Sequence, residues 1–400
     1  MRQNDMINIS FIAAHKEEAL LYGAGYDQNL LFCWNMETKE IQNLGAFREF
    51  GNFKGDNIIA VIKYGERLFC FSRISYEIVA WHLEEKTFIH YCPEDRTGEM
   101  EDIRSVCRVG NDVWMLQNVA ASSAMVFSME SGRFARYTTN IDLKQHFHIS
   151  EITSFAHENS VVAGDWLWRC IPGTDALLGL DTKTLETGVV KFQIPDTFYT
   201  ISNEEGWIYI LGVSGKHVIA WNPDTKEKIV WDTGYEGIKD RPFREVIKVG
   251  NRLFLLPCFE KKIFCYEIHE TKVCLICKLE YPAEFERMHD TENRSMFLGS
   301  VFMNKNLLYL FPMAGNGMLS LNTDSMKTSL FPIQVSKDEY LNSQTCAGKA
   351  ILENQIRLED YMDFVIARKT GTEQKNGNTC CAGKKCWEGV KQFLSREYKE

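Results

Sequence analysis

One pattern recurs along the chain and constrains its fold more than any other feature: two apolar runs joined by a short turn. The clearest copy is Glu245-Val-Ile-Lys-Val-Gly-Asn-Arg-Leu-Phe-Leu-Leu-Pro-Cys258. Apolar runs of this length around a Gly-Asn pair are typical of a β-hairpin. Further copies begin at Ala60, Ser105 and Ser300, and weaker ones at Phe11, Thr153 and Thr200. The expected turn positions are Glu17, Glu66, Asn111, Asn159, Gly206, Asn251 and Asn306.

A second signature follows each hairpin: an aromatic or apolar residue, a polar turn, and then another apolar run. Examples are Trp34-Asn-Met-Glu-Thr-Lys39 and Trp221-Asn-Pro-Asp-Thr-Lys226. Asn and Asp suit such turns because their side chains bond to nearby backbone groups. Each repeat is therefore expected to contain two hairpins, which makes four strands.

Seven repeats of four antiparallel strands, spaced by about 45 residues, predict an all-β fold, a seven-bladed β-propeller over residues 1–334. One such sheet cannot bury both of its faces alone. Packing seven sheets around an axis covers them, which explains why apolar residues fill the strands almost continuously.

The repeat resembles those of kelch-like and quinoprotein-like propellers, through the turn pattern apolar-x-Asp/Asn-x-x-Thr-Lys/Gly. It lacks the Gly-Gly pair of true kelch blades, the Gly-His and Trp-Asp pairs of WD repeats, and a regular tryptophan docking motif. The whole chain is similar to propeller proteins of gut Firmicutes. This resemblance implies the fold and no activity.

The repeat stops near residue 334, and residues 335–400 are expected to form a helical extension. Residues 352–369 and 386–398 both place apolar side chains at helical spacing. The two predicted helices either cap the propeller or form a docking element for a partner helix. The segment also contains Cys380, Cys381 and Cys386, which lack the paired spacing of a zinc knuckle and are interpreted as free thiols.

Composition narrows the class of protein. The net charge of −9 comes without long blocks of either sign, which argues against a nucleic-acid surface. The first ten residues lack the apolar core of a signal peptide, and no run approaches the roughly 20 apolar residues of a membrane span. Thirteen scattered cysteines are more typical of reduced thiols than of a disulfide framework. We therefore expect a cytoplasmic protein.

Strand direction separates the two faces of the predicted propeller. If the strands of a blade are named A to D from the axis outward, the A–B and C–D turns lie on one face, here called the turn face. The B–C loops and the connections between blades lie on the opposite face, the loop face. Two segments exceed the regular spacing: residues 165–174, assigned to a B–C loop, and residues 283–294, between blades six and seven. Both are expected on the loop face, where ligand binding is more common than on the scaffold.

Candidate ligand-binding residues are the polar and aromatic residues expected on the loop face. Arginines entering the first strands offer fork-shaped donors for an anionic or polyhydroxyl ligand. Trp166 and Trp168 suit an aromatic platform, or simply packing between blades. His146 and His148, with His289 or Asp165, would suit a metal but lack a fixed spacing, so no metal site and no cofactor is assigned. The full set is Arg48, Arg73, Arg104, His146, His148, Asp165, Trp166, Trp168, Arg169, His217, Arg244, Glu245, Arg287 and His289.

The sequence favours a non-catalytic binding propeller that recognises a protein or a glycan-related ligand. No nucleophile elbow, phosphate-binding loop or metalloprotease helix is present. The alternative is a carbohydrate-active lyase or hydrolase with its site on the axis, where carboxylates such as Glu49, Glu245 and Asp165 would serve as acid and base. A third possibility is an assembly subunit, which would expose an apolar patch.

Overall fold

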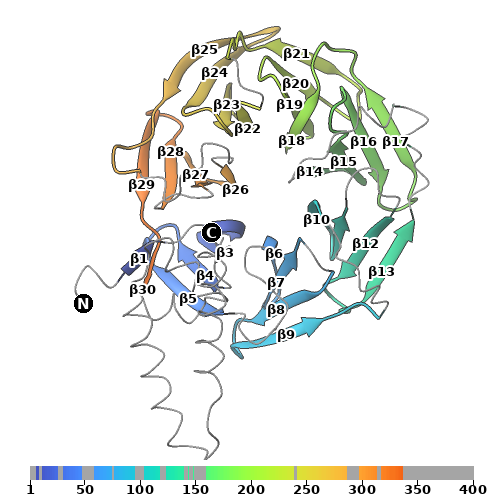
Figure 1. Ribbon diagram of the computed structural model, residues 1–400, viewed down its shortest axis with the longest axis vertical. Helices are drawn as coiled ribbons and strands as arrows, with labels where there is room; N and C mark the ends of the chain where they lie inside the picture. The colour runs from blue at the N-terminus through green and yellow to red at the C-terminus, as the bar shows by residue number, and fades with distance from the viewer. Residues whose placement is uncertain are drawn as a thin grey trace, which may run out of the picture.

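Seven antiparallel sheets of four strands each surround a common axis in the computed structural model, so the predicted seven-bladed propeller is confirmed (Figure 1). No α-helix occurs among the described residues. The structure describes residues 6–8, 11–25, 30–46, 58–73, 76–94, 103–117, 123–138, 143, 147, 159–237, 241–285, 297–312 and 317–336. The predicted helices at 352–369 and 386–398 lie outside these ranges.

Each blade runs outward from the axis in chain order (Figure 1). Blades one to three are β2 (Phe11–Glu17), β3 (Leu20–Gly25), β4 (Leu30–Asn35), β5 (Ile41–Ala46); β6 (Ile58–Tyr64), β7 (Arg67–Ser72), β8 (Ile78–His82), β9 (Thr87–Tyr91); and β10 (Ser105–Val109), β11 (Asp112–Leu116), β12 (Ser123–Ser128), β13 (Phe134–Thr138). Blades four and five are β14 (Ser160–Ala163), β15 (Trp166–Cys170), β16 (Ala176–Asp181), β17 (Thr187–Lys191); and β18 (Phe198–Glu204), β19 (Trp207–Gly212), β20 (His217–Trp221), β21 (Lys228–Asp232). Blades six and seven are β22 (Phe243–Val249), β23 (Arg252–Pro257), β24 (Ile263–His269), β25 (Lys272–Leu279); and β26 (Phe297–Asn304), β27 (Leu307–Pro312), β28 (Met318–Asn322), β29 (Lys327–Phe331).

The core lies between neighbouring blades. The two middle strands of each blade are buried along almost their whole length, whereas outer strands such as β13 alternate between partly and fully exposed residues. Phe69 of blade two packs against Phe127 of blade three, with ring centroids 5.6 Å apart. Burying both faces of each sheet requires apolar residues on both, which accounts for the continuous apolar runs in the sequence.

The second sequence signature is a structural turn at the C–D hairpin. The Asn35 side-chain oxygen accepts the backbone N–H groups of Glu37 at 2.8 Å and Thr38 at 3.1 Å. Lys39 then adopts a left-handed conformation with φ 66°, and its ammonium group lies over the Trp34 ring, 5.1 Å from the centroid. Blade five repeats the turn at residues 222–226. The signature therefore recurs because this turn requires a side-chain oxygen that accepts backbone N–H groups, followed by a residue in the left-handed conformation.

Blade four differs from the prediction in register. Its A–B turn is Gly164-Asp165, with Ala163 paired to Trp166, and not a turn at Asn159. Residues 166–170 consequently form β15, the second strand, and the assignment of residues 165–174 to a long B–C loop was wrong. The extra residues of this region precede the blade, between β13 and β14. Equal spacing of the repeats concealed this insertion.

The two ends of the propeller meet in a separate two-stranded sheet. Strand β1 (Met6–Asn8) pairs antiparallel with β30 (Gln334–Ser336), through Met6 with Ser336 and Asn8 with Gln334. The Val335 side chain is buried in a cluster that also contains Trp34 of blade one and Tyr309 of blade seven. This pairing therefore links the segment before blade one to the segment after blade seven, and it extends the strand structure to residue 336.

Candidate functional site

Strand register places seven residues at one level of the innermost strands. Counting back four positions from the last paired residue of each inner strand gives one residue per blade, a set called here the inner ring. These residues are Ala13, Ala60, Ser105, Asn159, Thr200, Glu245 and Ser300. Among the members whose side chains the structure describes, Ser105, Asn159, Thr200 and Glu245 are polar. They belong to consecutive blades, three to six, and form a polar arc on one side of the axis.

Two β-bulges turn side chains toward this arc. In β18, Phe198 pairs with Gly212 and Thr200 with Leu211, so Tyr199 is the extra residue. In β22, the same irregularity leaves Arg244 as the extra residue, between Phe243 and Glu245. A bulge breaks strand alternation and redirects the side chain that it carries. Tyr199 and Arg244 therefore hold equivalent places in adjacent blades.

Arg244 connects three blades at this level. Its guanidinium group lies over the Tyr199 ring, 5.7 Å from the centroid, and one nitrogen is 3.5 Å from the Tyr199 hydroxyl. The other terminal nitrogen donates to the Asn159 side-chain oxygen at 3.1 Å. Asn159 in turn donates to the Thr200 hydroxyl at 2.9 Å. Arg244 is only 6% exposed, so it lies behind the surface of the arc. From there it holds Asn159 and Tyr199 in place.

Glu245 is the one carboxylate of the inner ring. Its side chain keeps partial exposure, unlike the buried Arg244 beside it. Burial raises the pKa of Glu245 to about 7, and the positive charge of Arg244 only partly opposes that shift. Near neutral pH this carboxyl group can therefore either donate or accept a hydrogen bond, and it can exchange a proton with a bound ligand.

The predicted arginines Arg104 and Arg169 lie near the other end of the arc. Arg104 immediately precedes Ser105 at the start of β10, in the position that Arg244 holds relative to Glu245. Arg169 is buried and pairs across the sheet with Ser160, whose hydroxyl accepts a 2.7 Å hydrogen bond from Ser105. Arg104 and Arg244 thus lie one residue before a member of the inner ring in their own blades.

The predicted tryptophans lie on strand β15 and not in a loop. Trp168 is buried between blades four and five, edge to face against Trp221 with centroids 4.8 Å apart. Trp166 stacks on Trp168 at 5.4 Å and remains partly exposed. Asp165 belongs to the A–B turn, and it forms an ion pair with Lys183 at 2.8 Å. Asp165 is therefore on the turn face, contrary to the sequence prediction, because the blade-four hairpin lies later in the chain than predicted.

The remaining predicted residues do not join the arc within the described structure. Arg73 follows the end of β7, and its backbone oxygen accepts the N–H of Ile103 at 2.7 Å. His217 begins β20 in blade five and belongs to a separate network. The other predicted site residues lie outside the described ranges: Arg48, His146, His148, Arg287 and His289.

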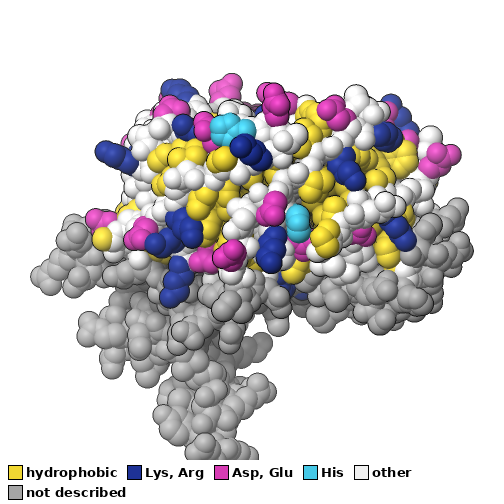
Figure 2. Space-filling view, turned by 90° about the horizontal axis from the view of Figure 1, so that it is seen from above, with side chains coloured by type: hydrophobic (Ala, Val, Ile, Leu, Met, Phe, Trp, Pro, Cys, Tyr) yellow, Lys and Arg dark blue, Asp and Glu magenta, His cyan; other side chains and the backbone are white. Residues whose placement is uncertain are grey.

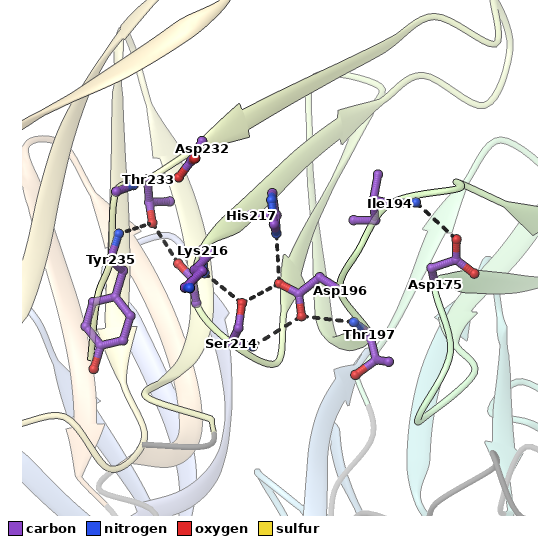
Figure 3. A network of polar contacts seen from close by, with 12 residues as sticks. Asp175, Ile194, Asp196, Thr197, Ser214, Lys216, His217, Asp232, Thr233 and Tyr235 are labelled. Carbon is purple, nitrogen blue, oxygen red and sulfur yellow. Dashed lines mark hydrogen bonds and ion pairs between the residues drawn. The ribbon is translucent and has the colours of Figure 1, made fainter. Parts of the chain in front are cut away.

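The network of His217 contains a Ser, a His and an Asp on the loop face of blade five (Figure 3). One oxygen of the buried Asp196 carboxylate lies 2.5 Å from the Ser214 hydroxyl and 3.1 Å from His217 Nδ1. The other oxygen accepts the backbone N–H of Thr197 at 2.9 Å. In a catalytic triad the serine bonds to the histidine, and the histidine to the carboxylate. Here both bond to the carboxylate, so the network secures the loop and does not activate the serine.

The described residues contain no group of three or more His, Cys, Asp or Glu side chains suited to a metal ion. They also contain no helix with the length and apolarity to cross a membrane. The nine described cysteines are all free thiols.

Comparison with known proteins supports the fold alone. No family model matches the sequence, and no curated protein matches it. Among solved structures, virginiamycin B lyase from Staphylococcus aureus aligns with 10% identity and a TM-score of 0.54, covering 77% of this chain and 95% of that one. A streptogramin B lyase has a TM-score of 0.55 at 10% identity, covering 83% and 96%. The β-propeller domain of Cps50 (Swd1) from Myceliophteria thermophila has a TM-score of 0.53 at 13% identity, covering 82% and 98%. These neighbours include two lyases and one propeller domain that is not named as an enzyme. Similarity of fold therefore does not determine the function of this chain.

The sequence predictions missed four members of the site: Ser105, Asn159, Tyr199 and Thr200. Asn159 was assigned to a turn because the repeats were assumed to be evenly spaced. Tyr199 and Thr200 carry no motif, although Phe198-Tyr-Thr200 and Phe243-Arg-Glu245 match in position when the hairpins are aligned. That alignment is the signal that could have found them.

Proposed function

We propose that this chain is a non-catalytic recognition propeller that binds a protein or a glycan-related ligand through its loop face. The observation that carries the proposal is the polar arc, in which Asn159 and Glu245 keep partial exposure while Ser105, Thr200 and Arg244 are buried behind them. The amide of Asn159 and the carboxyl group of Glu245 offer donors and acceptors that suit a hydroxyl-rich ligand. A glycan-related ligand is therefore the occupant that the arc favours. A cytoplasmic location remains part of the proposal.

Preorganisation supports binding at this position. The arc is held by the internal hydrogen bonds of Arg244 and Asn159, and not by groups that must be reordered when a ligand arrives. A site whose donors are already fixed loses less conformational entropy on binding.

A carbohydrate-active lyase or hydrolase is the second candidate, and Glu245 is the observation that favours it. A carboxyl group with a pKa of about 7 is suited to general acid or base catalysis at neutral pH. Glycoside hydrolysis, however, generally uses two carboxylates. The inner ring supplies only Glu245, so binding without chemistry remains the first proposal.

A panel of oligosaccharides, incubated with the full chain, separates the two functions. Calorimetry measures binding, and mass spectrometry of the recovered sugar detects cleavage. Binding of an unchanged oligosaccharide, weakened by Glu245→Gln, supports recognition, whereas new products that disappear in Glu245→Gln establish the enzyme. Glu204→Gln is the matched control, because Glu204 is exposed at the turn end of β18. Absence of binding to every sugar would refute the glycan proposal and leave a protein partner to be sought by pull-down.

A further inference from the structure

A cavity lies away from the axis, between blades five and six. Its volume is about 440 Å³, which is in the range of small-molecule sites. The walls come from the connection after β21, the loop before β24, and strands β24 and β25. Figure 2 looks onto the rim of the propeller on the side of β21 and β25, where hydrophobic side chains reach the surface between charged ones.

The floor and one wall of this cavity are apolar. Phe264 and Tyr266 of β24 line it from below, and Leu275 of β25 borders it. Leu275 is 46% exposed, which is unusual for a leucine in this well-packed fold. A bulge between Leu275 and Cys277 interrupts the pairing with β24 at this point. An apolar side chain of a ligand would cover surface that is otherwise in contact with water.

Two lysines of blade six line the cavity: Lys278 on β25, and Lys262 in the loop before β24. The ammonium group of Lys278 lies 4.6 Å from the centroid of the Phe264 ring. Among the described residues no ion pair of Lys278 is found, whereas Lys262 pairs with Glu280 at 2.5 Å. Lys278 is thus the cation available for a carboxylate.

Two carboxylates line the cavity from other segments. Glu260 lies in the loop before β24 and accepts a 2.7 Å hydrogen bond from the Tyr235 hydroxyl. Glu236 is exposed in the connection between blades five and six. Burial and the neighbouring Glu260 raise the pKa of Tyr235, so its hydroxyl stays protonated and continues to donate to Glu260.

The connection that carries these groups is fixed in place. The Thr233 hydroxyl donates to the backbone oxygen of Gly215 at 2.8 Å, and it accepts the Tyr235 N–H at 3.2 Å (Figure 3). The Tyr235 ring also packs edge to face against Phe264, with centroids 5.7 Å apart. The cavity is therefore formed before any ligand enters.

We propose that this cavity binds a free amino acid with a large apolar side chain. The ligand carboxylate would lie beside Lys278, its ammonium group beside Glu236 and Glu260, and its side chain against Leu275 and the aromatic floor. A ligand with a single charge would leave either Lys278 or the two glutamates without a partner of opposite charge. A ligand without a large apolar group would leave Leu275 exposed to water. This proposal concerns a different blade interface from the polar arc and does not depend on it.

Calorimetric titration of the full chain with three probes tests the proposal: L-phenylalanine, 3-phenylpropionate and 2-phenylethylamine. L-Phenylalanine should bind about tenfold more tightly than either singly charged probe, because each charged hydrogen bond contributes on that scale. Lys278→Met should weaken binding of L-phenylalanine and 3-phenylpropionate while leaving 2-phenylethylamine unchanged. Glu236→Gln should weaken binding of L-phenylalanine and 2-phenylethylamine while leaving 3-phenylpropionate unchanged.

Lys272→Met is the matched control, since Lys272 is exposed at the start of the same strand and does not line the cavity. It should bind all three probes as the parent does. Both altered lysines are on the surface strand, and thermal unfolding of each variant confirms that the fold is kept. Equal affinity for L-phenylalanine and a singly charged probe, an unaltered Lys278→Met variant, or no binding at all would overturn the proposal.

Discussion

Arg244 and Tyr199 occupy equivalent β-bulges of adjacent blades, and the guanidinium group of one lies over the ring of the other. The same departure from strand alternation, repeated in two neighbouring sheets, thus builds an inter-blade contact from residues that are 45 positions apart. This contact supports the polar arc at the axis.

Removing the Tyr199 hydroxyl should weaken this contact without disturbing its shape. Tyr199→Phe deletes the group within reach of Arg244 and Cys258, and we expect a loss of about 1 kcal/mol in the free energy of unfolding. Urea denaturation measures this value. Tyr137→Phe, in the outer strand β13, is a control that should change stability by less.

Glu245 should make stability depend on pH. Its folded pKa of about 7 exceeds the ordinary value of 4.5, so between these values the folded chain holds a proton that the unfolded chain releases. Its contribution is therefore fully present below about pH 4.5 and is lost as pH rises through 7. We expect the parent to lose about 1–3 kcal/mol relative to Glu245→Gln across this window, allowing for the partial exposure of the group. A constant difference between the two proteins from pH 4.5 to 7.5 would contradict the assignment.

Gly179 should tolerate no side chain. It pairs with Trp168, and an added β-carbon would lie 2.5 Å from that indole ring. Gly179→Ala should therefore lower the free energy of unfolding by about 1–3 kcal/mol, as overpacking in a rigid core does. Gly188 lies opposite Gly179 on β17, and its added β-carbon would meet nothing closer than 3.9 Å. Gly188→Ala should be nearly neutral in the same denaturation experiment.

The polar turn at the C–D hairpin should contribute to stability by itself. Asn222→Ala removes the acceptor of two backbone N–H groups, at 2.9 and 3.1 Å. We expect a cost of about 1 kcal/mol in chemical denaturation. Asp224 lies in the same turn with an exposed side chain, so Asp224→Ala provides the comparison. Equal effects of the two substitutions would show that the side-chain acceptor is not what stabilises the turn.

Closure of the ring should depend on strand β1. A chain lacking residues 1–8 cannot form the pairing with β30, and we expect a lower midpoint of thermal unfolding by calorimetry. A chain lacking residues 1–5 keeps β1 and is the control. Identical midpoints for the two truncations would mean that the pairing does not stabilise the ring.

The repeat made most of this fold predictable, because hairpin turns and apolar runs are local properties of a sequence. Blade four was misplaced for a physical reason: its turn Gly164-Asp165 resembles the others, but an insertion precedes the blade, and even spacing pointed to Asn159. The site was less predictable. Arg244 and Glu245 were found through their place in the hairpin, whereas the roles of Asn159 and Tyr199 arise from a hydrogen bond and a ring contact between blades. Such contacts depend on which blades are neighbours and on β-bulges, and residue type alone does not predict where those bulges occur.

The pairing of β1 with β30 also sets an order of events during synthesis. The first strand of the chain must wait for residues 334–336 before it has a partner. At about 5–20 residues per second, the interval between making the two strands is on the order of 20 to 60 s. During that time blades can form one after another, but the ring has an open seam between blade one and blade seven. A nascent chain that stops short of residue 334 leaves Trp34 and its neighbours without the Val335 cover, and it would present an apolar seam to the chaperones that monitor unfinished proteins.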